Sequence, residues 1–171
     1  MIKLFKVAFI ALGFFALTAC VSTSDIKVES TKSEKVDLDG YTKYQFLEGS
    51  GFAEDTSKDK LKKNKAASAE MEEQINTVLM KKGKVPVSKD PDFFVAYLGG
   101  VDKHHIDSKL NDKAKEKIKK HGDAAVVLML IDANTGAIIW MSTAEATVVN
   151  GTVESKKKRL DYAVNKMLSG V

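Results

Sequence analysis

The sequence predicts an α+β fold, a two-layer sandwich in which a mostly antiparallel sheet of about four to five strands packs against two helices. Two long apolar runs, residues 124–131 and 137–149, flank the segment Asp132-Ala133-Asn134-Thr135-Gly136. Asn and Gly tolerate positive φ, so this arrangement is typical of a β-hairpin with a three- to five-residue loop. Two other stretches, residues 66–82 and 154–168, place their apolar side chains at helical spacing.

The first strand is expected over residues 41–47, where Tyr44 and Phe46 fall on one face. The segment Gly49-Ser50-Gly51 ends this pattern. Residues 54–65 are charged and lack apolar periodicity, which predicts a loop or a frayed helix start.

The first helix is expected from about Ala66 to Lys82, with Gly83 supplying the left-handed residue that stops it. The second is expected from about Glu154 to Leu168, with Thr152 or Ser155 as its cap. The apolar stripes consist of Ala67, Met71, Ile75, Val78 and Leu79 in the first helix and of Leu160, Val164, Met167 and Leu168 in the second.

A further strand is expected over residues 93–98, entered through Asp90-Pro91 and interrupted by Gly99-Gly100, where a β-bulge is an option. The near-continuous apolar run at residues 126–130 predicts a central strand that the helices cover on at least one face.

The beginning of the chain has the layout of a secretory signal. Lys3 and Lys6 precede an apolar run at residues 7–19, and Cys20, the only cysteine of the chain, follows it. This run is too short to cross a bilayer, which takes about 20 apolar residues. We therefore expect residues 1–19 to be a cleaved signal peptide. A buried structural cysteine after such a signal is the alternative role for Cys20.

The segment Leu17-Thr18-Ala19-Cys20 resembles the lipobox of bacterial lipoproteins. The resemblance implies cleavage before Cys20, a diacylglycerol thioether on its sulfur and acylation of the new amino terminus. Val21 and Ser22 follow, and by resemblance to the sorting rule of enteric-type bacteria this favours the outer membrane. The membrane is thus one expected partner, reached through acylated Cys20.

Beyond the signal, residues 20–35 are expected to be a lipidated tether, and residues 36–171 a single domain. Ile26 and Val28 alternate with charged neighbours, which allows a short strand within this segment as an alternative to a flexible spacer. No disulfide can form with one cysteine. Without Lys3 and Lys6, 25 basic and 23 acidic residues remain, a net charge of +2 that does not favour nucleic acid.

Three segments together resemble the DUF4136 family of bacterial envelope lipoproteins. They are Val36-Asp37-Leu38-Asp39-Gly40-Tyr41, then Asp90-Pro91-Asp92-Phe93 with the strand after it, and the hairpin from Leu128 to Trp140. Met141-Ser142 depart from the family, which tends to place Arg or Lys and then Gly after the Trp. The resemblance implies an envelope location and a two-layer fold. It implies no catalytic residues.

Motifs for catalysis or cofactors are missing from the sequence: it holds no Gly-x-Ser-x-Gly, no phosphate-binding Gly-x-x-x-x-Gly-Lys and no His-Glu-x-x-His. The segment Asp102-Lys103-His104-His105-Ile106-Asp107, with His121 further on, contains metal-ligand residue types. Adjacent histidines point apart, and the nearby lysines repel a cation, so a solvated loop is the favoured interpretation. No catalytic, cofactor-binding or metal residue is predicted.

Two Lys-rich runs and two aromatic residues complete the candidates. Residues 109–120 allow a thin amphipathic helix on an anionic surface, although a solvated face is favoured. Residues 156–159 put positive charge at the start of the last helix, where it opposes the helix dipole and could face anionic lipid or an acidic partner. Trp140 and Phe94 are expected to be core or sheet-face aromatics.

Function is therefore predicted to be that of a membrane-anchored, non-enzymatic binding or structural module in the periplasm, with an envelope protein of unknown identity as its second expected partner. A small hydrolase or metal-dependent enzyme with an unrecognised site, and a lipid carrier with a cavity between sheet and helices, are the alternatives.

Overall fold

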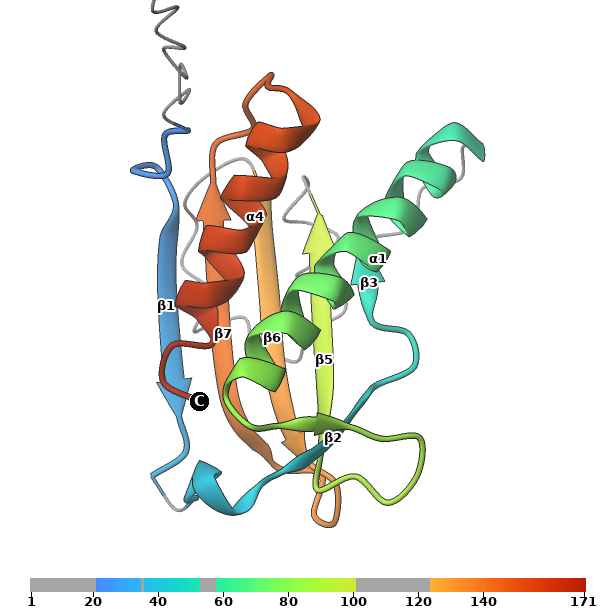
Figure 1. Cartoon of the computed structure of the whole chain (residues 1–171), viewed down its shortest axis with the longest axis vertical. Coiled ribbons are helices and arrows are strands. Elements are labelled where there is room, and N and C mark those ends of the chain that lie inside the picture. The colour runs from blue at the N-terminus through green and yellow to red at the C-terminus, as the bar shows by residue number, and fades with distance from the viewer. Residues whose placement is uncertain (1–20, 35, 53–57, 101–123) are drawn as a thin grey trace, which may run out of the picture.

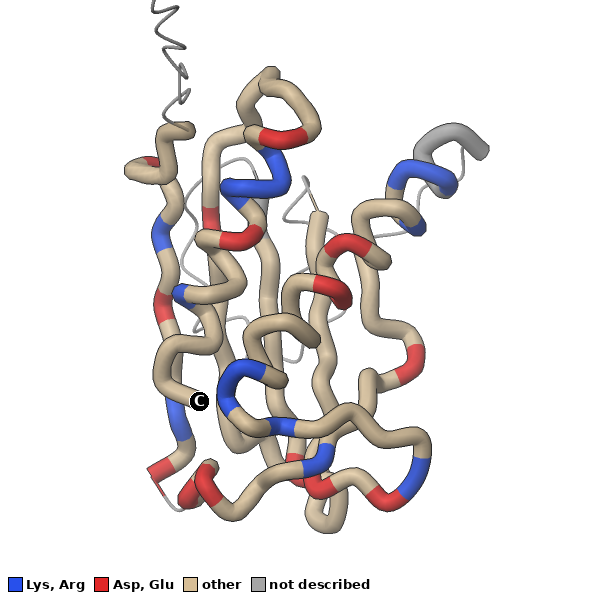
Figure 2. The backbone as a smooth tube through the Cα atoms, viewed as in Figure 1, with Lys and Arg blue, Asp and Glu red and all other residues tan. Residues whose placement is uncertain are grey.

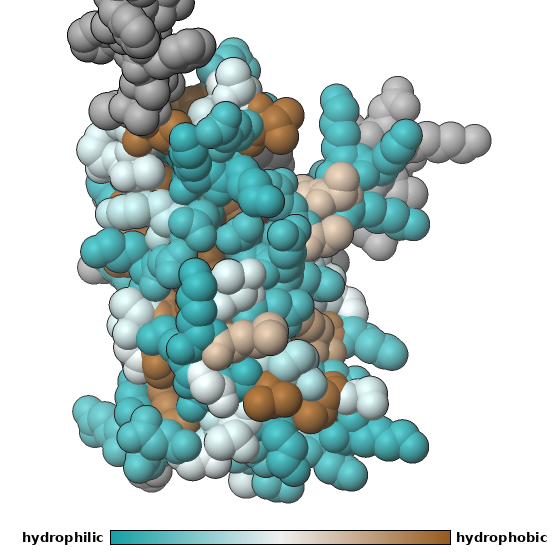
Figure 3. All heavy atoms as spheres, viewed as in Figure 1, coloured by the Kyte–Doolittle hydropathy of each residue, from teal (hydrophilic) through white to brown (hydrophobic). Residues whose placement is uncertain are grey.

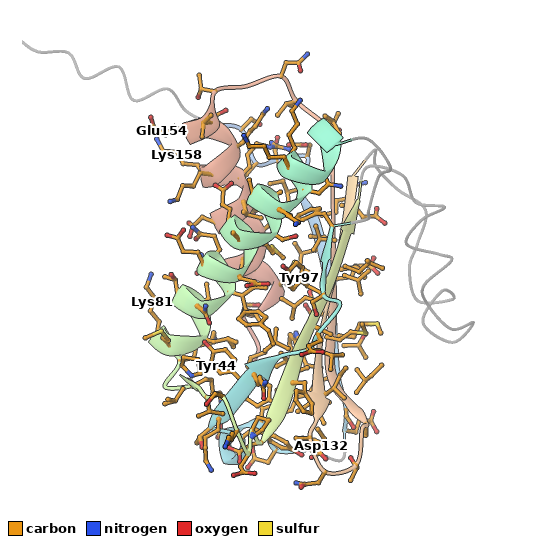
Figure 4. The ribbon with its side chains drawn as sticks, turned by 90° about the vertical axis from the view of Figure 1, so that its right-hand side faces the viewer. Tyr44, Lys81, Tyr97, Asp132, Glu154 and Lys158 are labelled. Atoms are coloured by element: carbon orange, nitrogen blue, oxygen red, sulfur yellow. The ribbon has the colours of Figure 1, made fainter. Side chains whose placement is uncertain are left out.

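The computed structural model describes residues 21–34, 36–52, 58–100 and 124–171 (Figure 1). They form a seven-stranded sheet with helices packed on one of its faces (Figures 1 and 4). The strands are β1 (Lys27–Lys32), β2 (Lys43–Phe46), β3 (Gly51–Phe52), β4 (Val85–Pro86), β5 (Phe93–Gly100), β6 (Ala124–Asp132) and β7 (Ile138–Ala146). The helices are α1 (Lys58–Lys81) and α4 (Val153–Met167), preceded by the short 3₁₀ helix η1 (Leu38–Gly40).

The sheet is mixed and larger than the predicted four to five strands. Its order is β1-β7-β6-β5-β2-β4, with β3 also paired to β5. Three pairs are antiparallel: β1 with β7, β7 with β6, and β6 with β5. The other three are parallel: β2 with β5, β2 with β4, and β3 with β5. The α+β class and the two helices are confirmed. The longest strand pairs are antiparallel, but the sheet has more strands than predicted and is not purely antiparallel. Helix α1 lies between β2 and β5 in the chain, and such a crossover allows parallel pairing.

The predicted hairpin is present as β6 and β7. Leu130 pairs with Trp140, and the register shifts by a bulge between Leu130 and Ile131. In the turn, Gly136 has a φ of 69° and its amide donates to the carbonyl of Asp132 at 2.9 Å. Strand β6 lies between β7 and β5, as expected for a central strand. Strand β7 ends at Ala146, short of the predicted residue 149.

Strand β5 continues through Gly99 and Gly100, so the predicted interruption is wrong. Gly99 pairs with Val126 on one side and with Phe52 on the other. A Cβ on Gly99 would lie only 2.4 Å from Cε1 of Phe52. The glycine is therefore needed because the Phe52 ring lies against the strand, and no bulge is involved.

Both predicted helices are present, with different starts. Helix α1 begins at Lys58, so it includes most of the charged stretch at 54–65, for which the sequence predicts a loop or a frayed helix start. Gly83, with a φ of 78°, follows its end as expected. Thr152 is the cap of α4, and its side chain accepts from the amide of Ser155.

The core lies between the helices and the inner face of the sheet. The Tyr97 hydroxyl reaches α1, donating to Glu72 Oε1 at 3.0 Å. Trp140 is buried, and its Nε1 donates to the carbonyl of Met167 in α4 at 3.0 Å. The fully buried large side chains are Tyr44, Met71, Ile75, Leu79, Phe93, Tyr97, Leu128, Leu130, Ile139, Met167 and Leu168.

Residues 20–35 were predicted to be either a flexible tether or a short strand, and residues 27–32 form a strand. This strand, β1, pairs antiparallel with β7 from Lys27 opposite Glu145 to Lys32 opposite Trp140. Val28 packs against the core from this position.

Several predictions lie outside the described residues. These are the signal peptide at 1–19, the lipidation of Cys20, the histidine segment with His104, His105 and His121, and the Lys-rich run at 109–120. Among the residues that the structure describes, no helix has the length and apolarity that crossing a membrane takes.

Candidate functional site

Asp132 stands at the end of β6, where three distant segments meet (Figure 4). Its Oδ2 accepts the hydroxyl of Tyr41 at 2.5 Å. Its Oδ1 accepts the amides of Asn134 and Thr135 at 3.0 and 2.6 Å, and the Thr135 hydroxyl at 2.8 Å. Both carboxylate oxygens are therefore occupied by donors. One side chain closes the β6–β7 turn and ties it to the chain before β2.

Asp92 makes a similar connection from the start of β5. Its Oδ2 accepts the amides of Thr42 and Lys43 at 2.9 and 2.6 Å, and the Thr42 hydroxyl at 3.0 Å. Its carbonyl accepts the amide of Ala133 at 3.0 Å. Asp92 therefore joins β2 to β5 and to the β6–β7 turn. We call Tyr41, Asp92 and Asp132 the aspartate cluster.

Electrostatics in the aspartate cluster keep both carboxylates ionised. The Tyr41 and Thr135 hydrogen bonds lower the pKa of Asp132 to about 2. Backbone amides of Lys43 and Thr42 lower the pKa of Asp92. The pKa of Tyr41 is raised, chiefly by its hydrogen bond to Asp132. A general base works best with a pKa near the working pH, so these groups are better suited to holding the fold than to moving protons.

The three segments that carry the family resemblance converge on this cluster. Tyr41 ends the first segment, Asp92 lies in the second, and Asp132 lies in the third. Their hydrogen bonds explain why aspartates stand at these positions.

A second polar group lies at the other end of the sheet and fixes the beginning of the described chain. Arg159 of α4 donates to both carboxylate oxygens of Asp25, from NH1 to Oδ1 at 2.8 Å and from NH2 to Oδ2 at 2.6 Å. It also donates to the carbonyls of Ser22 at 2.5 Å and Thr147 at 3.3 Å. The Thr147 amide donates back to Asp25 Oδ2 at 3.1 Å. We call Ser22, Asp25, Thr147 and Arg159 the N-terminal clasp.

Arg159 differs from the neighbouring lysines in its burial and in its partner. Arg159 is buried, with 9% of its surface exposed, and its hydrogen bond to Asp25 lowers the pKa of that carboxyl to about 2. Lys158 pairs instead with Glu154 at 2.9 Å, and Lys157 with Glu73 at 3.8 Å, both on the surface. Figure 2 shows basic residues in the first turns of α4. The hypothesis that all of residues 156–159 face lipid or a partner is wrong for Arg159, which is buried and paired with Asp25.

The face of the sheet turned away from the helices is also apolar. Side chains alternate along a strand, and Tyr97 points to α1, so Phe94 and Ala96 point the other way. Phe94 pairs with Ile131, Ala96 with Met129, and Met129 with Met141. We call these residues, Phe94, Ala96, Met129, Ile131 and Met141, the outer sheet face. Phe94, Met129 and Ile131 are partly exposed.

Sequence reasoning placed Trp140 and Phe94 correctly as core and sheet-face aromatics. It missed the N-terminal clasp and the joint role of Tyr41 and Asp132. No local signal marks Asp25 as the partner of Arg159. Asp92 and Asp132, in the second and third resemblance segments, were a usable signal for the aspartate cluster. Within the described ranges, no three or more His, Cys, Asp or Glu residues gather as a metal ion would require.

Comparison with known proteins gives a family and a fold. The family model described as "Domain of unknown function (DUF4136)" matches residues 28–170. The crystal structure of a DUF4136 family protein from Bacteroides thetaiotaomicron is similar with a TM-score of 0.54 and 9% identity, over 85% of this chain and 95% of that chain. This likeness shows the fold.

Two other solved structures have lower scores. A PDZ domain protein from Parabacteroides distasonis has a TM-score of 0.48 and 14% identity, over 85% of this chain and 36% of that one. A PelC dodecamer from Paraburkholderia phytofirmans has a TM-score of 0.48 and 16% identity, over 84% and 96%. No protein of curated function matches the sequence.

Proposed function

The chain belongs to the DUF4136 family, and from that premise we propose that it is a lipid-anchored module of the bacterial envelope that binds a protein partner without catalysing a reaction. In this proposal acylated Cys20 holds the domain at the inner leaflet of the outer membrane, facing the periplasm. The family is one of unknown function, so the proposal rests on the residues of this chain.

The N-terminal clasp carries the proposal. Only Val21 separates Cys20 from Ser22, whose carbonyl Arg159 binds at 2.5 Å. The bidentate pair with Asp25 then fixes the next turn of chain. A lipid on Cys20 would therefore hold the folded domain close to the bilayer. Bidentate Arg–carboxylate pairs are geometrically specific, which suits a fixed orientation.

The ionised state of the polar clusters supports binding over catalysis. Asp25 and Asp132 have pKa values of about 2 because hydrogen-bond donors occupy their oxygens. Proton transfer at neutral pH favours groups with pKa values near 7. These carboxylates instead connect segments of the fold.

The outer sheet face supplies a surface that suits a protein partner. Phe94, Met129 and Ile131 are adjacent on paired strands and partly exposed. Aromatic and Met side chains are enriched where proteins bind one another. We place the partner on this face.

The anchor is tested by mass spectrometry of the protein purified from its own membrane, with Cys20→Ser as the control. We expect an acylated Cys20 peptide and flotation of the wild-type protein with membranes, and release of the variant. An unmodified Cys20 in membrane-bound protein contradicts the anchor.

The partner surface is tested by a photo-crosslinking amino acid at Met129, with Met80 as the matched site. Met80 lies on α1, and 58% of its surface is exposed. We expect an adduct of one defined mass from position 129 and none from position 80. The same adducts from both positions, or none from either, contradict this surface.

A further inference from the structure

Three exposed valines lie in the connection between β7 and α4 and at the first position of α4. Val148, Val149 and Val153 have 55%, 40% and 81% of their surface exposed. Residues 146–153 contain no charged side chain, although 29% of the whole chain is charged. The connection forms the loop at the top of Figure 1, and apolar atoms appear at this end of the surface in Figure 3. We call Val148, Val149 and Val153 the valine tip.

The valine tip lies directly beside the point where the chain enters the domain. Thr147, the residue before Val148, belongs to the N-terminal clasp through its amide and its carbonyl. Arg159 joins the same group to the carbonyl of Ser22. Figure 1 shows the chain entering at the end of the sheet that carries this loop. A lipid on Cys20 would thus be tethered next to the tip.

We propose that the valine tip inserts into the lipid surface beside the anchor and sets the orientation of the domain on the membrane. This inference rests on the proposed lipid anchor. Exposed apolar side chains in a loop add nothing to the core, whereas an interfacial apolar group buries about 5–10 Å into the headgroup region.

The charges next to the tip fit a lipid surface. Lys156 is exposed in the first turn of α4, and Lys158, which pairs with Glu154 at 2.9 Å, follows two residues later. Positive charge at a helix start opposes the helix dipole, so helix stability does not explain Lys156. Lipid phosphates attract cations at this depth. Arg159, which completes the basic run, is held inside by Asp25.

An orientation follows from the position of the tip. Figure 4 shows Glu154 and Lys158 at one end of the molecule and Asp132 at the other. With the first end on the membrane, the aspartate cluster points into the periplasm. The partly exposed Phe94, Met129 and Ile131 of the outer sheet face would then lie on the side of the domain, where the proposed partner would reach them.

The experiment uses the acylated protein in vesicles of phosphatidylethanolamine and phosphatidylglycerol. An environment-sensitive fluorophore is attached at Val149→Cys in one sample and at Ile138→Cys in the other. The acylated Cys20 thiol does not react, so each label is unique. The two positions are matched in exposure, at 40% and 41%, and Ile138 begins β7 beside the Asp132 turn. Val153→Cys serves as a second tip site.

We expect a blue-shifted emission and quenching by spin-labelled lipid at position 149, severalfold above that at position 138. Adding Val148→Ser and Val153→Ser should reduce this quenching without changing flotation. If Cys20 is acylated but quenching is equal at positions 149 and 138, the proposal that the valine tip inserts is wrong, whereas the proposed lipid anchor is retained. Protein that lacks acyl groups and does not float overturns both.

Discussion

Arg159 and Asp25 lie 134 positions apart in the chain and form a bidentate ion pair, with both N–O distances at or below 2.8 Å. The pair joins helix α4 to the segment before β1, and Thr147 shares it from the end of β7. It therefore closes the domain at the end where the chain enters.

Replacing Arg159 with Met should lower the free energy of unfolding by about 2–3 kcal/mol, because it leaves Asp25 and two carbonyls without their shared donor. Urea denaturation followed by Trp140 fluorescence measures the change. Lys158→Met is the control on the same helix: its pair with Glu154 is exposed, so its loss should cost about 0.5 kcal/mol or less. Equal losses in the two variants would contradict a structural role specific to Arg159.

Stability should fall as the solution is acidified from about pH 5 towards pH 2. Asp25 and Asp132 have pKa values of about 2 in the folded chain against a reference of 3.8, so the unfolded chain binds protons first. Their stabilisation is complete above the unfolded pKa and disappears through the folded one. Urea midpoints at several pH values measure the slope. An Asp25→Asn, Asp132→Asn double variant should have a shallower slope, and an unchanged slope would rule out these two groups as its cause.

Removing the Tyr41 hydroxyl should lower the urea midpoint, because Asp132 Oδ2 loses a donor at 2.5 Å. Tyr41→Phe tests this with little change in volume. Tyr162→Phe is the matched variant, since the Tyr162 ring contacts Lys166 through its face and a phenyl ring preserves that contact. In a double-mutant cycle Tyr41→Phe and Asp132→Asn should be non-additive, and additivity would argue against a direct bond.

Gly99→Ala should lower the free energy of unfolding by about 1–3 kcal/mol, because the new Cβ overlaps the Phe52 ring. Gly40→Ala, in η1, meets no atom within 4 Å and should cost far less. Thermal unfolding of the two variants gives the comparison. A Gly99→Ala variant as stable as Gly40→Ala would mean that Phe52 moves aside freely.

The sequence predicts the elements with strong local patterns and misses what depends on distant contacts. The hairpin and both helices follow from runs and stripes, and Gly83 follows from its position after the α1 stripe. Strands β3 and β4 have two residues each, too few for a period to appear. The parallel pairing of β2 with β5 depends on the path of α1, which no residue pattern in the strands records.

The polar groups divide in the same way. Asp92 and Asp132 stand in turn-forming segments whose chemistry is local, so their importance could be suspected from sequence. In the sequence, Arg159 is the last of four consecutive basic residues and nothing distinguishes it from the three lysines. Its pairing with Asp25 depends on the fold, because the two residues are far apart in the chain. From sequence alone, Gly99 is expected to interrupt the strand. The reason for a glycine at this position is the distant Phe52 ring, which lies against it in the fold.

The pairing of β1 with β7 determines how the domain resists mechanical load. Tension applied through the N-terminus pulls along the axis of β1, whereas the ladder bonds to β7 run across that axis. The bonds from Lys27 to Lys32 are therefore sheared together instead of peeling one after another. The Arg159–Asp25 pair lies upstream of the ladder and takes the force first. If the chain is anchored through Cys20 as proposed, a pull on the anchor would therefore load the ion pair and the whole β1–β7 ladder before it reached the core.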